Sequence, residues 1–300
     1  MRIARLIRCA VAAACGLAVA QAAAAETPQR AARLDVARIV SVNGAVTEIV
    51  YALGADRHLV GVDTTSLFPP EALAKLPNVG YVRALSAEGI LSLRPSMVLL
   101  TKDAGPPAVL AQLRAAGVNL VSVPDDYSVR GVADKIRAVA MAVGKADDGE
   151  RMATRFLRNV ASVERTIAGA QARPKVLFVL SAARGAAMAA GQNTAADAMI
   201  RLAGGVNAVQ GYDGYKPFVP EAVVGAAPEF FIIASHALDN IGGVEKFLAR
   251  PEVANTPAGQ AKRVIVMNSA QLLGFGPRTA HAMRDLAQSL HPGLQFSALE

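Results

Sequence analysis

Aromatic, methionine and arginine side chains gather on loops that follow the predicted strands of this chain. In a parallel α/β sheet, ligands bind beyond the carboxyl ends of the strands, so these loops should form the walls of a cleft. An apolar, aromatic cleft with a few arginines suits a large flat ligand that carries carboxylates. Each side chain also has a simpler interpretation, as a core residue or a solvated charge. The candidate ligand-binding residues are Phe68, Tyr81, Arg83, Tyr127, Met188, Tyr215, His236 and Arg278.

Motifs of the common enzyme classes are absent from the sequence. It contains no G-x-S-x-G motif, no P-loop, no H-E-x-x-H motif and no G-x-G-x-x-G after a predicted strand. The histidines show no zinc spacing, and only His236 is placed at the end of a strand on the cleft side. We therefore predict a binding protein with no catalytic residues, and the alternative is an exported α/β enzyme.

A unit made of a helix, a proline and a strand occurs twice. Glu88 lies seven residues before Pro95, and Glu221 lies seven residues before Pro228; an apolar, β-rich run follows each proline. Ser86 is placed to cap the first of these helices, where the helix dipole favours a nearby acidic residue. Two copies of one unit predict two similar lobes, each with a glutamate at the same helix start.

Predicted strands and helices alternate along most of the chain, which indicates α/β lobes with parallel, helix-covered sheets. The exception is residues 128–170, where two helices follow each other. The second, Asp147 to Ala170, has Asp147 or Asp148 as its expected cap and is a candidate spacer between lobes or an ordinary packing helix. The predicted strands are Arg38–Val42, His58–Asp63, Met97–Thr101, Val118–Val123, Lys175–Ser181, Phe230–Ser235 and Arg263–Met267.

The first 25 residues read as a signal peptide. A positively charged start is followed by an apolar run from Cys9 to Ala20 and by Ala23-Ala24-Ala25, which fits a cleavage site. The competing interpretation makes Cys15 a lipidated residue. Removal of this segment takes away both cysteines and three arginines, and it lowers the net charge from +7 to +4. The charge therefore gives no support to nucleic-acid binding, and the sequence predicts an exported, disulfide-free protein.

Six stretches between residues 37 and 292 share the pattern of one family: GAVTEIVYALG, VGVDTTSLFPPEA, LPNVGYVRALSAEGILSLRP, DAGPP, AGQNTAADAMIRLAGGVNAV and GYKP. In these stretches the chain resembles the periplasmic heme-binding proteins of bacterial heme-uptake ABC transporters. The resemblance implies a class III periplasmic binding protein: a monomer whose two α/β lobes are joined by one long helix. It also implies heme as the transported ligand and an inner-membrane ABC permease as the partner, onto which Glu88 and Glu221 would dock. The predicted division is a signal peptide (1–25), an N-terminal lobe (26–127), linking helices (128–172) and a C-terminal lobe (173–300).

The sequence departs from the family at the residue that commonly ligates the heme iron. Members of this group carry a tyrosine in a T-S-x-Y-P loop, whereas this chain has Phe68 there, and the loop at residues 181–184 lacks the histidine of some relatives. Tyr81 is the first alternative ligand, because it lies in the most heme-like stretch, and Tyr127, Met188, Tyr215 and His236 are the others. The open alternatives for the ligand are a corrinoid, a ferric siderophore or a metal ion, and scarce histidines disfavour the last.

Overall fold

A computed structural model of the protein describes residues 38–181, 188–217 and 219–300. The predicted signal peptide, Cys9 and Cys15 lie outside these residues, as does most of the glycine-containing loop before Met188. Within the described part of the chain, no helix is both long and apolar enough to cross a membrane.

The N-terminal lobe contains a fully parallel four-stranded sheet in the order β2-β1-β5-β6. The side chains of the sheet alternate between two helical layers. Ile39 and Leu99 join the core beneath α1 (Gly44–Ala52) and α5 (Val129–Ala142), whereas Val40 and Val98 join the core beneath α3 (Ala87–Ser92) and α4 (Pro107–Ala115). The sheet is therefore covered on both faces, as the continuous apolar strands predicted. Its elements are β1 (Ile39–Ser41), α1 (Gly44–Ala52), a 3-10 turn (Asp56–His58), β2 (Leu59–Val62), α2 (Glu71–Lys75), α3 (Ala87–Ser92), β5 (Met97–Leu100), α4 (Pro107–Ala115) and β6 (Asn119–Ser122).

The two glutamates of the repeated helix–proline–strand unit lie at helix starts, as the sequence predicted. Glu88 is in the first turn of α3, and the Ser86 hydroxyl caps that helix by accepting a hydrogen bond from the Gly89 N–H at 3.1 Å. Glu221 is in the first turn of α8 (Pro220–Ala226), and both glutamates are exposed. The equivalence of the two helix starts is therefore confirmed.

The C-terminal lobe contains a mixed sheet in the order β10-β8-β7-β11-β12, with β9 also paired to β7. The expectation of a parallel sheet is wrong at one edge, because β8 runs antiparallel to both β7 and β10. Neither β8 nor β10 is among the strands predicted from the sequence, because short, glycine-flanked strands of this kind carry little periodic signal. The elements are β7 (Lys175–Ser181), β8 (Met188–Ala190), α7 (Ala195–Leu202), β9 (Val206–Asn207), β10 (Tyr215–Pro217), α8, β11 (Phe230–Ala234), α9 (Ser235–Ile241), α10 (Val244–Leu248), α11 (Pro251–Ala254), α12 (Pro257–Gln260), β12 (Val264–Met267), α13 (Ser269–Leu273) and α14 (Thr279–Leu290).

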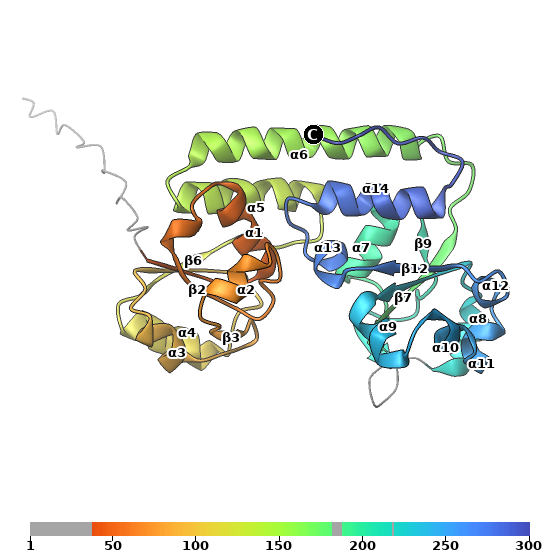
Figure 1. Cartoon of the computed structure of the whole chain (residues 1–300), viewed down its shortest axis with the longest axis horizontal. Coiled ribbons are helices and arrows are strands. Elements are labelled where there is room, and N and C mark those ends of the chain that lie inside the picture. The colour runs from red at the N-terminus through yellow and green to blue at the C-terminus, as the bar shows by residue number, and fades with distance from the viewer. Residues whose placement is uncertain (1–37, 182–187, 218) are drawn as a thin grey trace, which may run out of the picture. The chain divides into compact units, whose positions relative to one another are not determined.

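The long helix α6 (Ala146–Ile167) packs against both α5 (Val129–Ala142) and α14 (Figure 1). Its buried stripe includes Met152, Phe156, Val160 and Val163, as the spacing predicted. The expected cap is wrong: α6 begins after Lys145 with no side-chain cap, and both aspartates lie in its first turn. There they stabilise the helix dipole as charges rather than as hydrogen-bond acceptors of a cap. Because α5 belongs to the N-terminal half and α14 to the C-terminal half, α6 is the helix that joins the lobes.

Candidate ligand-binding site

One cavity of about 560 Å³ is lined by residues from both lobes. This volume falls within the roughly 300–1,000 Å³ that is usual for small-molecule sites. The N-terminal wall comes from the loops after β1, β2, β5 and β6 and from a small ribbon, β3 (Gly80–Tyr81) paired with β4 (Ala84–Leu85). The C-terminal wall comes mainly from α13 and the loop between α13 and α14, and β7, α7, β10 and α9 each add one residue. The N-terminal strands thus present their carboxyl ends to the cavity, as the sequence predicted.

The loop that carries Phe68 is held in place by the buried carboxylate of Asp63 at the end of β2. Its Oδ2 accepts hydrogen bonds from the Thr65 backbone N–H at 3.1 Å and from the Thr65 hydroxyl at 2.7 Å, and Oδ1 accepts from the Ser66 hydroxyl at 2.9 Å. The Thr65 hydroxyl also accepts from the N–H of Gly44 at 2.9 Å. A Cβ at Gly44 would lie 2.2 Å from the Thr65 carbonyl oxygen, so this approach of α1 to the loop requires glycine.

Phe68 is covered on one side by a charged side chain from the other lobe. The guanidinium carbon of Arg278 lies 3.6 Å from the centroid of the Phe68 ring, a cation–π contact. Glu48, buried on α1, accepts hydrogen bonds from Arg278 Nη2 at 2.9 Å and from the Arg278 backbone N–H at 3.2 Å. The charge of Arg278 is therefore balanced within the protein, and Glu48 fixes the guanidinium over the ring. Arg278 Nε is buried without a hydrogen-bond partner among the described residues.

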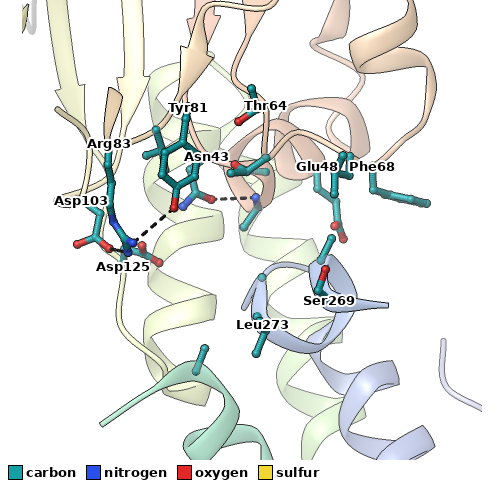
Figure 2. A pocket seen from close by; sticks show the side chains of 18 of the residues that line it. Asn43, Glu48, Thr64, Phe68, Tyr81, Arg83, Asp103, Asp125, Ser269 and Leu273 are labelled. Carbon is teal, nitrogen blue, oxygen red and sulfur yellow. Dashed lines mark hydrogen bonds and ion pairs between the residues drawn. The ribbon is translucent and has the colours of Figure 1, made fainter. Parts of the chain in front are cut away.

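Tyr81 and Arg83 form a second polar group, which Figure 2 shows on the opposite side of the drawn pocket from Phe68. Tyr81 closes β3, and Arg83 lies in the turn between β3 and β4. Arg83 donates from Nη2 to Asp103 Oδ2 at 2.9 Å and from Nη1 to the Tyr81 hydroxyl oxygen at 3.4 Å (Figure 2). The bond to Asp103 raises the pKa of the Arg83 guanidinium. The ribbon thus brings a phenol, a permanent cation and a carboxylate together on the cavity wall.

A third group fastens the two halves of the chain beneath the cavity. Lys135 on α5 has a fully buried side chain, and its Nζ lies 2.6 Å from Asp125 Oδ1 and 2.9 Å from the carbonyl oxygen of Phe275. The rings of Tyr127 and Phe275 also pack together, with centroids 5.3 Å apart and an interplanar angle of 57°. These contacts tie the loop after β6 and helix α5 to the segment just before α14.

Two cavity tyrosines are held in the protonated form. Burial raises the pKa of Tyr127, and the carboxylates of Asp125 and Asp103 raise it further. Burial also raises the pKa of Tyr215 to about 12, with a smaller contribution from Tyr127. Both phenols are therefore hydrogen-bond donors at neutral pH rather than anionic ligands.

The structure brings most of the predicted site residues together. Phe68, Tyr81, Arg83, Tyr127, Tyr215, His236 and Arg278 all line the cavity. Met188 does not: it lies in β8, paired with Ser181 and Pro217, because the predicted loop forms a strand there. His236 begins the exposed face of α9, and its Nδ1 lies 3.5 Å from the Ser269 hydroxyl oxygen.

Sequence reasoning missed four charged residues of the site: Glu48, Asp103, Asp125 and Lys135. Asp103 and Asp125 follow predicted strands on the cleft side, so their position was a usable signal. Glu48 and Lys135 lie inside helices, where no local pattern marks them. The partner of Glu48, Arg278, is 230 residues away. Lys135 pairs with the Asp125 carboxylate across the loop before α5 and with the carbonyl oxygen of Phe275, which is 140 residues away. Over the part of the chain that the structure describes, no group of three or more His, Cys, Asp or Glu side chains is placed to hold a metal ion.

A family model described as "Periplasmic binding protein" matches residues 39–270. The chain belongs to the periplasmic binding protein family. This membership confirms the predicted fold class, and it identifies a transport binding protein rather than an enzyme.

Among solved structures, this periplasmic binding protein is similar to "Periplasmic heme-binding protein RhuT from Roseiflexus sp. RS-1 in apo form", with 43% identity, a TM-score of 0.81 and coverage of 85% of this chain and 98% of that chain. It is also similar to "Periplasmic heme-binding protein BhuT in complex with two hemes", with 44% identity, a TM-score of 0.80 and the same coverage. A more distant relative is the vitamin B12-binding protein of Vibrio cholerae, which is 26% identical over 254 residues, 84% of this chain and 88% of that protein. The family resemblance drawn from the sequence is thereby confirmed.

Proposed function

We propose that this periplasmic binding protein captures heme in the cavity between its lobes and delivers it to an inner-membrane ABC permease. The observation that carries the proposal is the cavity wall itself, in which Phe68, Tyr81, Tyr127 and Tyr215 supply aromatic surface and Arg83 supplies a cation. A porphyrin is flat, apolar at its centre and anionic at its two propionates, so it needs both kinds of surface. Identity above 40% to two heme-binding proteins supports the same ligand.

The iron ligand that we propose is Tyr81. Phenylalanine at position 68 offers no lone pair to iron, and the pKa values of Tyr127 and Tyr215 are raised, which disfavours their phenolates. Tyr81 is 44% exposed on the cavity wall, and its hydroxyl oxygen accepts a hydrogen bond from Arg83 Nη1 at 3.4 Å, so the oxygen is accessible to a ligand. Tyrosinate is an established protein ligand of heme iron. Phe68 would then cover part of the porphyrin by stacking.

Titration with hemin, followed by visible absorption, tests the proposal. The parent protein should give a saturable, shifted Soret band whose end point counts the hemins bound per chain. Tyr81→Phe should abolish the tyrosinate features, whereas Tyr51→Phe, which removes a phenol of α1 outside the cavity lining, should leave the spectrum unchanged. Absence of any saturable change with the parent protein would refute heme as the ligand, and an unchanged spectrum of Tyr81→Phe would refute only the ligand assignment.

We further propose that the chain acts in the periplasm after cleavage near Ala25, as a monomer, with the division into lobes and linking helices predicted from the sequence. Two similar solved structures are named as periplasmic proteins, which supports an extracytoplasmic location for this chain. Glu88 and Glu221 are proposed to dock onto the permease, since both are exposed charges in the first turns of equivalent helices. With one docking residue on each lobe, the permease would contact both lobes and orient the cavity towards the entrance of its transport pathway.

A corrinoid is the second candidate ligand, because the vitamin B12-binding relative covers most of this chain. A parallel titration with cyanocobalamin separates the two ligands. Saturable binding of cyanocobalamin at lower concentration than hemin would favour the corrinoid.

A further inference from the structure

Every arginine that lines the cavity within the described residues is already paired with a carboxylate. Arg83 pairs with Asp103, and Arg278 pairs with Glu48, each at 2.9 Å. The remaining lining carboxylate, Asp125, is neutralised by Lys135. A ligand that carries carboxylates therefore meets no unpaired arginine on this wall, and it has to compete with the protein's own acids.

The two arginine pairs differ in how firmly the carboxylate is held. The Glu48 side chain is 9% exposed and binds two donors of Arg278, its backbone N–H and its guanidinium. The Asp103 side chain is 35% exposed, the Arg83 side chain is 61% exposed, and a single hydrogen bond joins them. Exposed ion pairs are weak because water screens them, whereas a buried pair with a second hydrogen bond resists exchange. Arg83 is therefore the cation that a ligand carboxylate can reach.

We infer that Asp103 sets the specificity and affinity of the site for carboxylate-bearing ligands by competing for Arg83. This inference rests on the proposed function and adds to it a residue that opposes binding. Asp103 accepts a hydrogen bond from Arg83 Nη2 and Arg83 Nη1 donates to the Tyr81 hydroxyl oxygen, so the guanidinium is held at the cavity wall. When a ligand carboxylate joins the same guanidinium, the two carboxylates lie close together and repel each other. The repulsion weakens binding and speeds release, which suits a protein that must pass its ligand on.

The test replaces Asp103 with asparagine, which keeps the side-chain size and removes the charge. Asp103→Asn should bind hemin about fivefold to tenfold more tightly and release it correspondingly more slowly, since one like-charge contact is removed. Hemin dimethyl ester has the same iron and ring but no carboxylate, so its affinity should not change. The gain should also vanish in an Arg83→Met background.

Asp56→Asn is the matched control, because it removes an exposed carboxylate of the same lobe outside the cavity lining. It should leave hemin binding unchanged. The inference is overturned by an Asp103→Asn variant that binds hemin no more tightly than the parent, by an equal gain for the ester, or by an equal gain in Asp56→Asn. If the parent binds neither hemin nor the ester, both the proposed function and the inference are refuted. If the parent binds both, heme binding is supported and the Asp103→Asn comparison alone decides the inference.

Discussion

Replacement of Lys135 by methionine should destabilise the protein strongly, although it keeps the length and apolar stem of the side chain. Lys135 is fully buried, and its ammonium group contacts only the Asp125 carboxylate and the Phe275 carbonyl oxygen among the described residues. Without the lysine, Asp125 becomes an unpaired carboxylate whose side chain is 11% exposed. Breaking a buried ion pair on one side costs about 3–5 kcal/mol.

The lower end of that range applies here, because Asp125 borders the cavity and can recover part of its hydration. We therefore expect a loss of about 3 kcal/mol in the free energy of unfolding, which corresponds to a fall of roughly 5–10 °C in Tm for a chain of this size. Urea unfolding followed by far-ultraviolet circular dichroism measures the free energy, with no ligand present. Lys145→Met is the matched control. Among the described residues Lys145 forms only an exposed ion pair, with Asp148 at 3.6 Å, so its removal should cost about 0.5 kcal/mol or less.

The double variant Lys135→Met/Asp125→Asn separates the cause from a simple packing defect. If the penalty comes from an orphaned charge, removal of that charge should restore at least half of the lost stability. The argument that an unpaired, buried Asp125 causes the loss would be refuted by a double variant as unstable as Lys135→Met alone. It would also be refuted if Lys135→Met lost less than about 1 kcal/mol in the free energy of unfolding.

Three further outcomes concern the cavity wall, the proposed docking residues and a buried tyrosine. Phe68→Tyr should tighten hemin binding and shift its visible spectrum towards a tyrosinate-ligated form; an unchanged affinity and spectrum would mean that Phe68 does not face the iron. Glu88→Lys combined with Glu221→Lys should abolish heme uptake in cells while purified protein still binds hemin, and normal uptake would exclude docking through these residues. Because burial raises the pKa of Tyr215 to about 12 in the folded state, the neutral phenol stabilises the fold at low and neutral pH, and that stability is lost as pH rises from about 10 to about 12. Tyr215→Phe should flatten the alkaline loss of stability in this window by on the order of 2 kcal/mol, and an identical pH profile in both proteins would show that Tyr215 is not buried.

Local patterns in the sequence were enough to predict most of the fold. The continuous apolar run at Met97–Leu100 predicts a strand that is buried on both faces of the sheet. The apolar residues of α6 recur with the helical period and predict which face of that helix is buried. The cap at Ser86 is equally local, because the hydroxyl oxygen and the Gly89 N–H that it binds are three residues apart. The same reasoning placed seven ligand-binding candidates on one cavity, since loops at the carboxyl ends of parallel strands converge.

The tertiary structure alone decided which polar and charged groups pair around the cavity. Glu48 and Arg278 are 230 residues apart, and Lys135 and Phe275 are 140 residues apart, so only the packing of the C-terminal segment on the N-terminal lobe brings them together. Strand β8 likewise depends on pairing with β10 rather than on its own three residues. Periodicity reports the burial of a segment, whereas a salt bridge or a strand register depends on the position of a second, distant segment. For that reason the sequence predicts the aromatic cavity wall, and the pairing of each cavity cation emerges only in the folded chain.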